Sequence, residues 1–182
     1  FRFNSKTYQK IILEILKSKK KYGSRFKKNE KYNIEFVSAN PTGPMHIGHS
    51  RGAIYGDVLA NLLKFNGNTV TKEYYINDYG NQIINFTESV FLRLREIKFN
   101  EKFTAKENLY PGSYVIDIAK KILIDTPEID ITDFKKIFST LSEISLKQSM
   151  ILIQDDLQSL GISHDNFVSE KSLVNKDLVA KS

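Results

Sequence analysis

Residues 34–49 have the sequence IEFVSANPTGPMHIGH, and the rest of the chain can be interpreted outward from them. The stretch begins as a strand, because Tyr32, Ile34 and Phe36 alternate onto one face. The valine that follows Phe36 adds apolar character to the opposite face. We therefore expect a strand over residues 32–38 that is covered on both sides.

A rigid loop and a helix follow this strand. Asn-Pro at 40–41 and Gly-Pro at 43–44 interrupt the strand, since proline lacks a donor N–H and restricts the residue before it. A helix is then predicted to begin at His46 or Ile47. Its large apolar residues recur at helical spacing and are Ile47, Ile54, Val58, Leu62 and Phe65.

The first turn of this helix carries two histidines. His46 and His49 are three residues apart and therefore lie on one face. The N-terminus of a helix offers unpaired N–H groups and a positive dipole end, and two imidazoles there can donate hydrogen bonds to phosphoryl oxygens. Zinc is the alternative ligand, but the chain has no Cys and no HExxH motif. We favour a phosphate site.

Small residues form a ridge along the same helix. Gly48, Gly52, Gly56 and Ala60 recur every four residues. Each glycine inside a helix costs about 1 kcal/mol relative to alanine. Something should therefore approach the backbone closely: a nucleotide base at Gly48 is one possibility, and for Gly56 packing against a neighbouring element is favoured.

The composition of the chain excludes some classes of protein. The 182 residues are 41% hydrophobic, which is ample for a core, and no apolar run is long enough to span a membrane. The absence of cysteine excludes disulfides and thiolate metal sites, and is compatible with a reducing compartment. Because the first residue is Phe1, we expect a fragment of a longer protein.

The net charge of +6 suits an anionic partner. Much of it comes from one basic segment near the N-terminus, which could contact an RNA backbone or be a solvated linker; we favour the linker. The segment contains Lys17, Lys19, Lys20, Lys21, Arg25, Lys27, Lys28 and Lys31.

The remaining pattern predicts an α/β fold. β-branched and aromatic residues indicate a second strand over 69–76 and a third over 165–168, with helices over 81–97 and 134–160. A strand, a helix and a strand in this order form a parallel, right-handed unit. We predict a Rossmann-like parallel sheet, first half, with a mostly helical insertion. The predicted divisions are an upstream domain end with a linker (1–30), the first βαβ half (31–98), the insertion (99–133) and the continuing domain (134–182).

Three ordered segments carry a family resemblance. His46-Ile47-Gly48-His49 matches the HIGH signature of class I aminoacyl-tRNA synthetases, which related nucleotidyltransferases share. The longer run SANPTGPMHIGH at 38–49, YYINDYGNQI at 74–83 and FVSE at 167–170 resemble bacterial-type arginyl-tRNA synthetases in the same order. The resemblance covers nearly the whole chain.

This resemblance implies a reaction in two steps. L-arginine reacts with ATP to give arginyl-adenylate and pyrophosphate, and the arginyl group then passes to the 3′ end of tRNA(Arg). It implies Mg²⁺ travelling with the nucleotide, no metal held by the protein, a monomer and a cytoplasmic location.

The resemblance also implies roles for individual residues. The catalytic pair would be His46 and His49, which would bind ATP together with Pro41, Gly43 and Gly48. Arginine would be bound by Glu35, Ser38 and Asn40, while Asp78 and Gln82 would border the site. A guanidinium needs charged planar acceptors, so Glu35 is chemically apt, although it could instead be a strand-end residue paired with a lysine. Asn40 could simply form the turn before Pro41, and His164 is expected to be a surface residue.

One departure from the family pattern stands out. The lysine-rich KMSKS loop is not found, and Lys181-Ser182 is too short to represent it. We therefore expect the first half of a catalytic domain, inactive alone. Two alternatives remain open: an adenylyltransferase that shares the HIGH loop, or a basic RNA-binding module.

Overall fold

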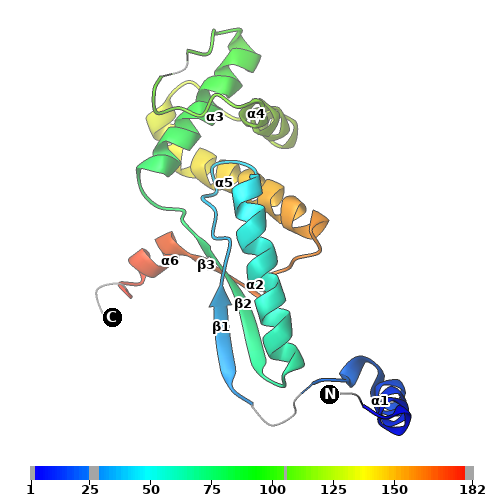
Figure 1. The fold of residues 1–182 in the computed structure, drawn as a ribbon. Helices are drawn as coiled ribbons and strands as arrows, with labels where there is room; N and C mark the ends of the chain where they lie inside the picture. The colour runs from blue at the N-terminus through cyan, green and yellow to red at the C-terminus, as the bar shows by residue number, and fades with distance from the viewer. Residues whose placement is uncertain (1–2, 25–28, 105, 179–182) are drawn as a thin grey trace.

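The computed structural model describes residues 3–24, 29–104 and 106–178. Three strands among these residues form one parallel sheet with the order β1-β2-β3 (Figure 1). The strands are β1 (Lys31–Glu35), β2 (Thr69–Ile76) and β3 (Asn166–Ser169), and β2 is the central one. The prediction of parallel pairing in an α/β fold is confirmed.

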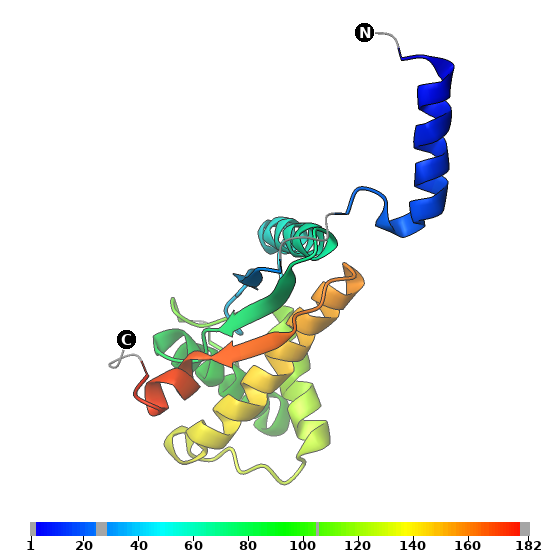
Figure 2. The same ribbon diagram turned by 90° about the horizontal axis from the view of Figure 1, so that it is seen from below.

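Helices account for most of the remaining structure. Their bounds are α1 (Ser5–Ser18), η1 (Lys19–Lys21), α2 (Ile47–Phe65), α3 (Asn81–Phe99), α4 (Ser113–Asp125), α5 (Phe134–Ser159) and α6 (Glu170–Asn175). None of the described helices is both long and apolar enough to cross a membrane. No residue of α1 is buried, and Figures 1 and 2 show it apart from the sheet. Arg25, Lys27 and Lys28 of the predicted basic segment lie outside the described residues.

One face of the sheet carries the core. Because strand order follows chain order, right-handed crossovers place α2 and α5 on the same face. A buried apolar cluster joins these helices to the sheet through Phe36, Ala53, Tyr74, Ile153, Leu157 and Ile162. A second cluster lies among α3, α4 and α5 and includes Phe86, Leu94, Ile122 and Leu141. The long helix α5 therefore belongs to both cores.

The first strand differs from its prediction. It ends at Glu35 rather than at residue 38, because Val37 and Ser38 have φ values of +69° and +42°. It is also mostly exposed, whereas we expected cover on both sides. The reason is its position: among the described residues, β1 pairs only with β2 and lies at the edge of the sheet.

Helix α2 begins as predicted, with His46 as its N-cap, and the glycine after its C-cap, Gly67, has a φ of +86°. It turns its small residues to the core: Ala53, Gly56 and Ala60 are buried. A Cβ on Gly56 would lie 2.3 Å from Cγ of Phe36, so the packing explanation of that glycine is confirmed. The large residues of the helical pattern are 41–88% exposed; they are Ile47, Ile54, Val58, Leu62 and Phe65.

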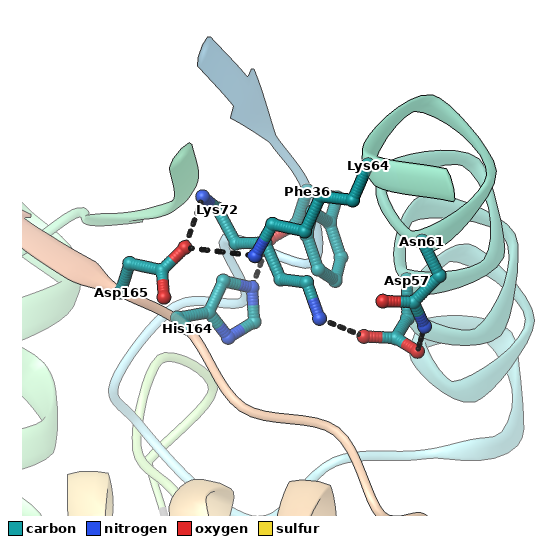
Figure 3. Close-up of polar contacts among 7 residues, drawn as sticks. All are labelled: Phe36, Asp57, Asn61, Lys64, Lys72, His164 and Asp165. Atoms are coloured by element: carbon teal, nitrogen blue, oxygen red, sulfur yellow. Dashed lines mark hydrogen bonds and ion pairs between the residues drawn. The ribbon is translucent and has the colours of Figure 1, made fainter. Parts of the chain in front are cut away.

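A partly buried ion pair also fixes α2 on the sheet. Lys72 of β2 pairs with Asp57 of α2, with Nζ and Oδ1 2.5 Å apart (Figure 3). Asn61 donates to the other oxygen of Asp57 at 2.7 Å, and the backbone N–H of Lys72 donates to Asp165 at 2.8 Å. The orientation of α2 about its own axis is thus fixed by this directional ion pair as well as by the packing of its small residues.

The later helices agree with their capping signals. Asp133 caps α5 by accepting from the N–H of Lys135 at 2.9 Å, and Gly161 follows the helix with a φ of +72°. Helical spacing predicts Ile151 on the buried side of α5, together with Ile137, Leu141 and Ile144. Ile151 is instead exposed, because that side is completed by Ser145, Ser149, Ile153 and Leu157. The division of the chain at residues 99–133 remains a prediction.

Candidate active site at the head of helix α2

The loop between β1 and α2 leaves the sheet at the carboxyl end of its strands, where open α/β sheets bind ligands. It starts with a strained turn. The N–H of Ser38 donates to the carbonyl of Phe36 at 3.1 Å around Val37, which has a positive φ. This pattern is a γ-turn of the rare positive-φ kind, and a β-branched residue at its centre is costly.

Two of the residues predicted to bind arginine, Glu35 and Ser38, meet at this turn. The Ser38 hydroxyl donates to the Glu35 carboxylate, and Ser38 Oγ accepts from the backbone N–H of Tyr75 at 3.0 Å. In a regular parallel ladder that N–H would bond the carbonyl of Phe36. The γ-turn therefore substitutes a side-chain oxygen for a backbone oxygen and brings Ser38 against Glu35. Glu35 itself is exposed and pairs with no lysine among the described salt bridges.

Three side-chain amides, hydrogen-bonded one to the next, connect the loop to α3. Asn40 donates to Oε1 of Gln82 at 2.7 Å and accepts from Nδ2 of Asn77 at 2.9 Å. Asn40 therefore does more than form the turn before Pro41. The side chains of Gln82 and Asn77 come from the start of α3 and the end of β2, so these amides connect three elements at the sheet edge.

Asp78 has a different environment. Its two carboxylate oxygens accept from the hydroxyl of Ser169 at 2.6 Å and from the N–H of Lys171 at 2.8 Å. These bonds connect the end of β2 to the start of α6. Both carboxylate oxygens of Asp78 are thus bonded within the fold, and its place at the border of the site remains a prediction.

The second half of the loop is held by other elements. The hydroxyl of Tyr114 in α4 donates to the carbonyl of Thr42 at 2.9 Å, and the N–H of Met45 donates to Asp156 of α5 at 2.9 Å. Gly43 lies directly on the Tyr114 ring, where a Cβ would come within 2.9 Å of the ring. Gly43 is therefore required by this close approach.

The two histidines cap α2 with their own rings. Nδ1 of His46 accepts from the N–H of Gly48 at 3.1 Å, and Nδ1 of His49 accepts from the N–H of His46 at 3.3 Å. The rings stack with centroids 3.7 Å apart and planes 18° apart. Since both Nδ1 atoms accept, the proton of each neutral ring is on Nε2. Burial, and secondarily the nearby His46, lowers the pKa of His49 and favours its neutral form.

Gly48 is explained within the chain. A Cβ there would lie 2.9 Å from Cε1 of His46, so the capping ring occupies the space that a side chain would need. This differs from our interpretation, which left the space for a base. Gly52, one turn later, has no atom within 4 Å of the position of its missing Cβ, and the helix surface is open there.

These groups line a cleft of about 430 Å³. Its walls are Asn40, Thr42, Gly43, Pro44, Met45, His46, His49, Tyr110 and Tyr114. Of the predicted site residues, Asn40, Gly43, His46 and His49 come together here. Pro41 is buried, and neither Glu35 nor Ser38 is among the lining residues, although we expected both to face the same pocket.

The sequence reasoning missed several neighbours of this cleft. Tyr110 and Tyr114 lie in a segment that we assigned only to an insertion, and Asn77 was given no role of its own. No local pattern marks them, because the Tyr114–Thr42 bond spans 72 positions of the chain. Among the residues that the structure describes, no group of three or more His, Asp or Glu side chains is arranged to hold a metal ion.

A parallel sheet whose first crossover helix begins with a HIGH turn defines a class I aminoacyl-tRNA synthetase fold. The chain belongs to the family of class I tRNA synthetases (R), catalytic domain, which it matches over residues 11–145.

Individual relatives agree with this family. The chain is 49% identical to an arginine–tRNA ligase of Pelagibacter ubique and 45% identical to one of Ehrlichia ruminantium. Each alignment covers 100% of this chain but 32% of the relative, so the chain spans about a third of their length. A crystal structure from Campylobacter jejuni, described as an arginyl-tRNA synthetase, superposes with a TM-score of 0.85 at 34% identity, over 94% of this chain and 38% of that one.

Proposed function

We propose that the protein to which this chain belongs is an arginine–tRNA ligase, which activates L-arginine with ATP and transfers it to the 3′ end of tRNA(Arg). The observation that carries the proposal is the stacked pair of histidines at the head of α2, in the wall of the cleft. The names of the relatives support arginine as the amino acid.

The activation step transfers an adenylyl group. A carboxylate oxygen of arginine attacks the α-phosphorus of ATP, the bond from that phosphorus to the bridging oxygen breaks, and pyrophosphate leaves. Such a reaction needs positioning and stabilisation of charge rather than a covalent enzyme intermediate. The Nε2–H groups of His46 and His49 are two donors held in place by the helix cap, and we assign them to phosphoryl oxygens.

The amino acid is assigned to the first half of the loop. Glu35 supplies a carboxylate for the guanidinium, with Ser38 orienting it and Asn40 offering an amide. Asp78 and Gln82 border this region. We assign ATP to the second half of the loop, from Pro41 to His49, including Gly43 and Gly48, although the close approaches at these two glycines are made by the Tyr114 and His46 rings.

Class I tRNA synthetases use ATP with Mg²⁺. We infer that the Mg²⁺ ion arrives bound to the phosphates of the nucleotide. We further propose that the protein acts as a monomer in the cytoplasm, with residues 1–30 linking an upstream domain, 31–98 and 134–182 forming the catalytic sheet, and 99–133 inserted between them.

ATP–pyrophosphate exchange by the full-length protein tests this function. Each amino acid is supplied in turn, with and without tRNA(Arg). We expect arginine to be the only amino acid that supports exchange. Exchange that does not depend on an amino acid would identify an adenylyltransferase. RNA binding without any exchange would identify an RNA-binding module. Either result would refute the proposal.

A further inference from the structure

His164 lies under the strained turn, although we expected it on the surface. It is half-buried just before β3, and its ring packs on Phe36 at a centroid distance of 4.3 Å. The edge of Tyr74 meets it at 5.3 Å and 87°. Figure 3 shows His164 between Phe36 and Asp165, beside the Lys72 side chain. The ring is therefore held by aromatic neighbours on one side and approached by a polar cluster on the other.

The hydrogen bond of His164 has one possible direction. Its Nε2 lies 3.3 Å from the carbonyl oxygen of Phe36, which can only accept, so Nε2 carries the proton. Nδ1 is buried and has no hydrogen-bond partner among the described residues. Burial is the main influence on this ring and lowers the pKa of His164, although the bond to Phe36 opposes the shift. A buried acceptor without a partner is costly, so the ring's position needs a reason.

The reason lies in the backbone that the ring contacts. The Phe36 carbonyl is the acceptor of the γ-turn, and it has lost its regular ladder partner, because Ser38 Oγ takes the N–H of Tyr75. His164 supplies a second donor to that carbonyl and so fixes its direction. A turn with a valine at positive φ persists only where its surroundings hold it in place.

Two neighbouring contacts complete this support. The hydroxyl of the fully buried Tyr74 donates to the carbonyl of Ala39 at 2.8 Å, on the far side of the turn. Residues 36–39 are thus held from β2 and from the segment leading into β3. The following residues, by contrast, are held by Tyr114 and Asp156 of α4 and α5.

We propose that His164 is a positioning residue for the amino-acid half of the site: its Nε2–H fixes the Phe36 carbonyl and thereby the γ-turn that orients Glu35, Ser38 and Asn40. This inference rests on the proposed function. The separate supports of the two halves of the loop predict that loss of the His164 donor affects arginine and leaves ATP largely unaffected.

Two variants of the full-length protein separate the donor from the bulk of the ring. His164→Leu removes the N–H and keeps an apolar side chain, whereas His164→Gln retains a donor near the position of Nε2. We expect His164→Leu to raise the KM for arginine by about tenfold, with the KM for ATP changed by less than about twofold. His164→Gln should recover most of the loss. Tyr114→Phe is the matched control, since it removes one hydroxyl from the other half of the loop and should raise the KM for ATP instead.

A second measurement does not depend on activity. Hydrogen exchange of the backbone amides should accelerate at Ser38 and Tyr75 in His164→Leu, while that of Met45 stays as in the wild type. The positioning role is overturned if amide exchange at the turn is unchanged, if His164→Gln is as defective as His164→Leu, or if both KM values rise together. A wild-type protein without arginine-dependent exchange would refute the proposed function, whereas the amide exchange would still decide whether His164 holds the turn.

Discussion

Two glycines on helix α2 allow the packing of the core to be tested with one added methyl group each. Gly56→Ala would place a Cβ 2.3 Å from Cγ and 2.6 Å from Cδ2 of Phe36. Gly52→Ala, one turn away on the same helix, would meet no atom within 4 Å. Both changes give the same gain in helix propensity, about 1 kcal/mol. Any difference between them therefore reports the contact with Phe36.

The size of that difference follows from the geometry. Carbon atoms in contact lie about 3.5–4 Å apart, so Phe36 must withdraw by more than about 1 Å. Phe36 is buried, and its ring centroid lies 4.3 Å from that of His164, which restricts the movement. We therefore take the upper part of the usual overpacking range, about 3 kcal/mol. Less the propensity gain, Gly56→Ala should lower the free energy of unfolding by about 2 kcal/mol, and Gly52→Ala should raise it by about 1 kcal/mol.

Thermal unfolding followed by circular dichroism measures both variants. In a domain of this size about 1 kcal/mol corresponds to 2–4 °C, so Tm should fall by about 4–8 °C for Gly56→Ala and rise by about 2–4 °C for Gly52→Ala. The reasoning would be refuted if both variants shifted Tm in the same direction. It would also fail if Gly56→Ala were the more stable of the two.

Three further outcomes are expected. Glu35→Gln should raise the KM for arginine about tenfold or more and leave that for ATP unchanged, because a charged acceptor is lost; unaltered arginine kinetics with a lower Tm would make Glu35 structural. His46→Ala and His49→Ala should each lower kcat by about 10²–10³, and glutamine at either position should restore part of it; stoichiometric zinc lost with activity would contradict the phosphate role. Because its folded pKa is lowered below 6.5, His164 contributes stability that is present above pH 6.5 and lost as the pH falls, so His164→Leu should show a smaller fall in Tm between pH 7.5 and pH 5. Equal slopes for the two proteins would contradict this.

Local signals predicted most of the fold. The strand at Thr69–Ile76 has its predicted bounds, since β-branched and aromatic residues mark it and a glycine turn precedes it. The start of α2 at Ile47 and the cap of α5 at Asp133 also follow from local chemistry. In each case the decisive interaction lies within a few residues of the chain.

Interactions between distant segments explain what could not be predicted. Val37 suits a strand by composition, and only its surroundings show why it turns: the nearby Ser38 hydroxyl takes the N–H of Tyr75 from another strand. The sequence pattern also did not predict which face of α2 packs on the sheet, because the large apolar residues that indicate the helix lie on its exposed side. Its buried side is chosen by Gly56 against Phe36 and by the ion pair of Asp57.

The two supports of the loop suggest why the site is spread over so much of the chain. Under the proposed function this loop carries both substrates and must fix two geometries at once, and a single anchor would couple them. Here residues 36–39 are hydrogen-bonded to β2 and to the segment that precedes β3. Thr42 and Met45 are hydrogen-bonded to α4 and α5. The segment predicted as an insertion therefore contributes directly to the cleft through Tyr114. A change in that segment can alter one half of the loop while the bonds that hold the other half stay in place.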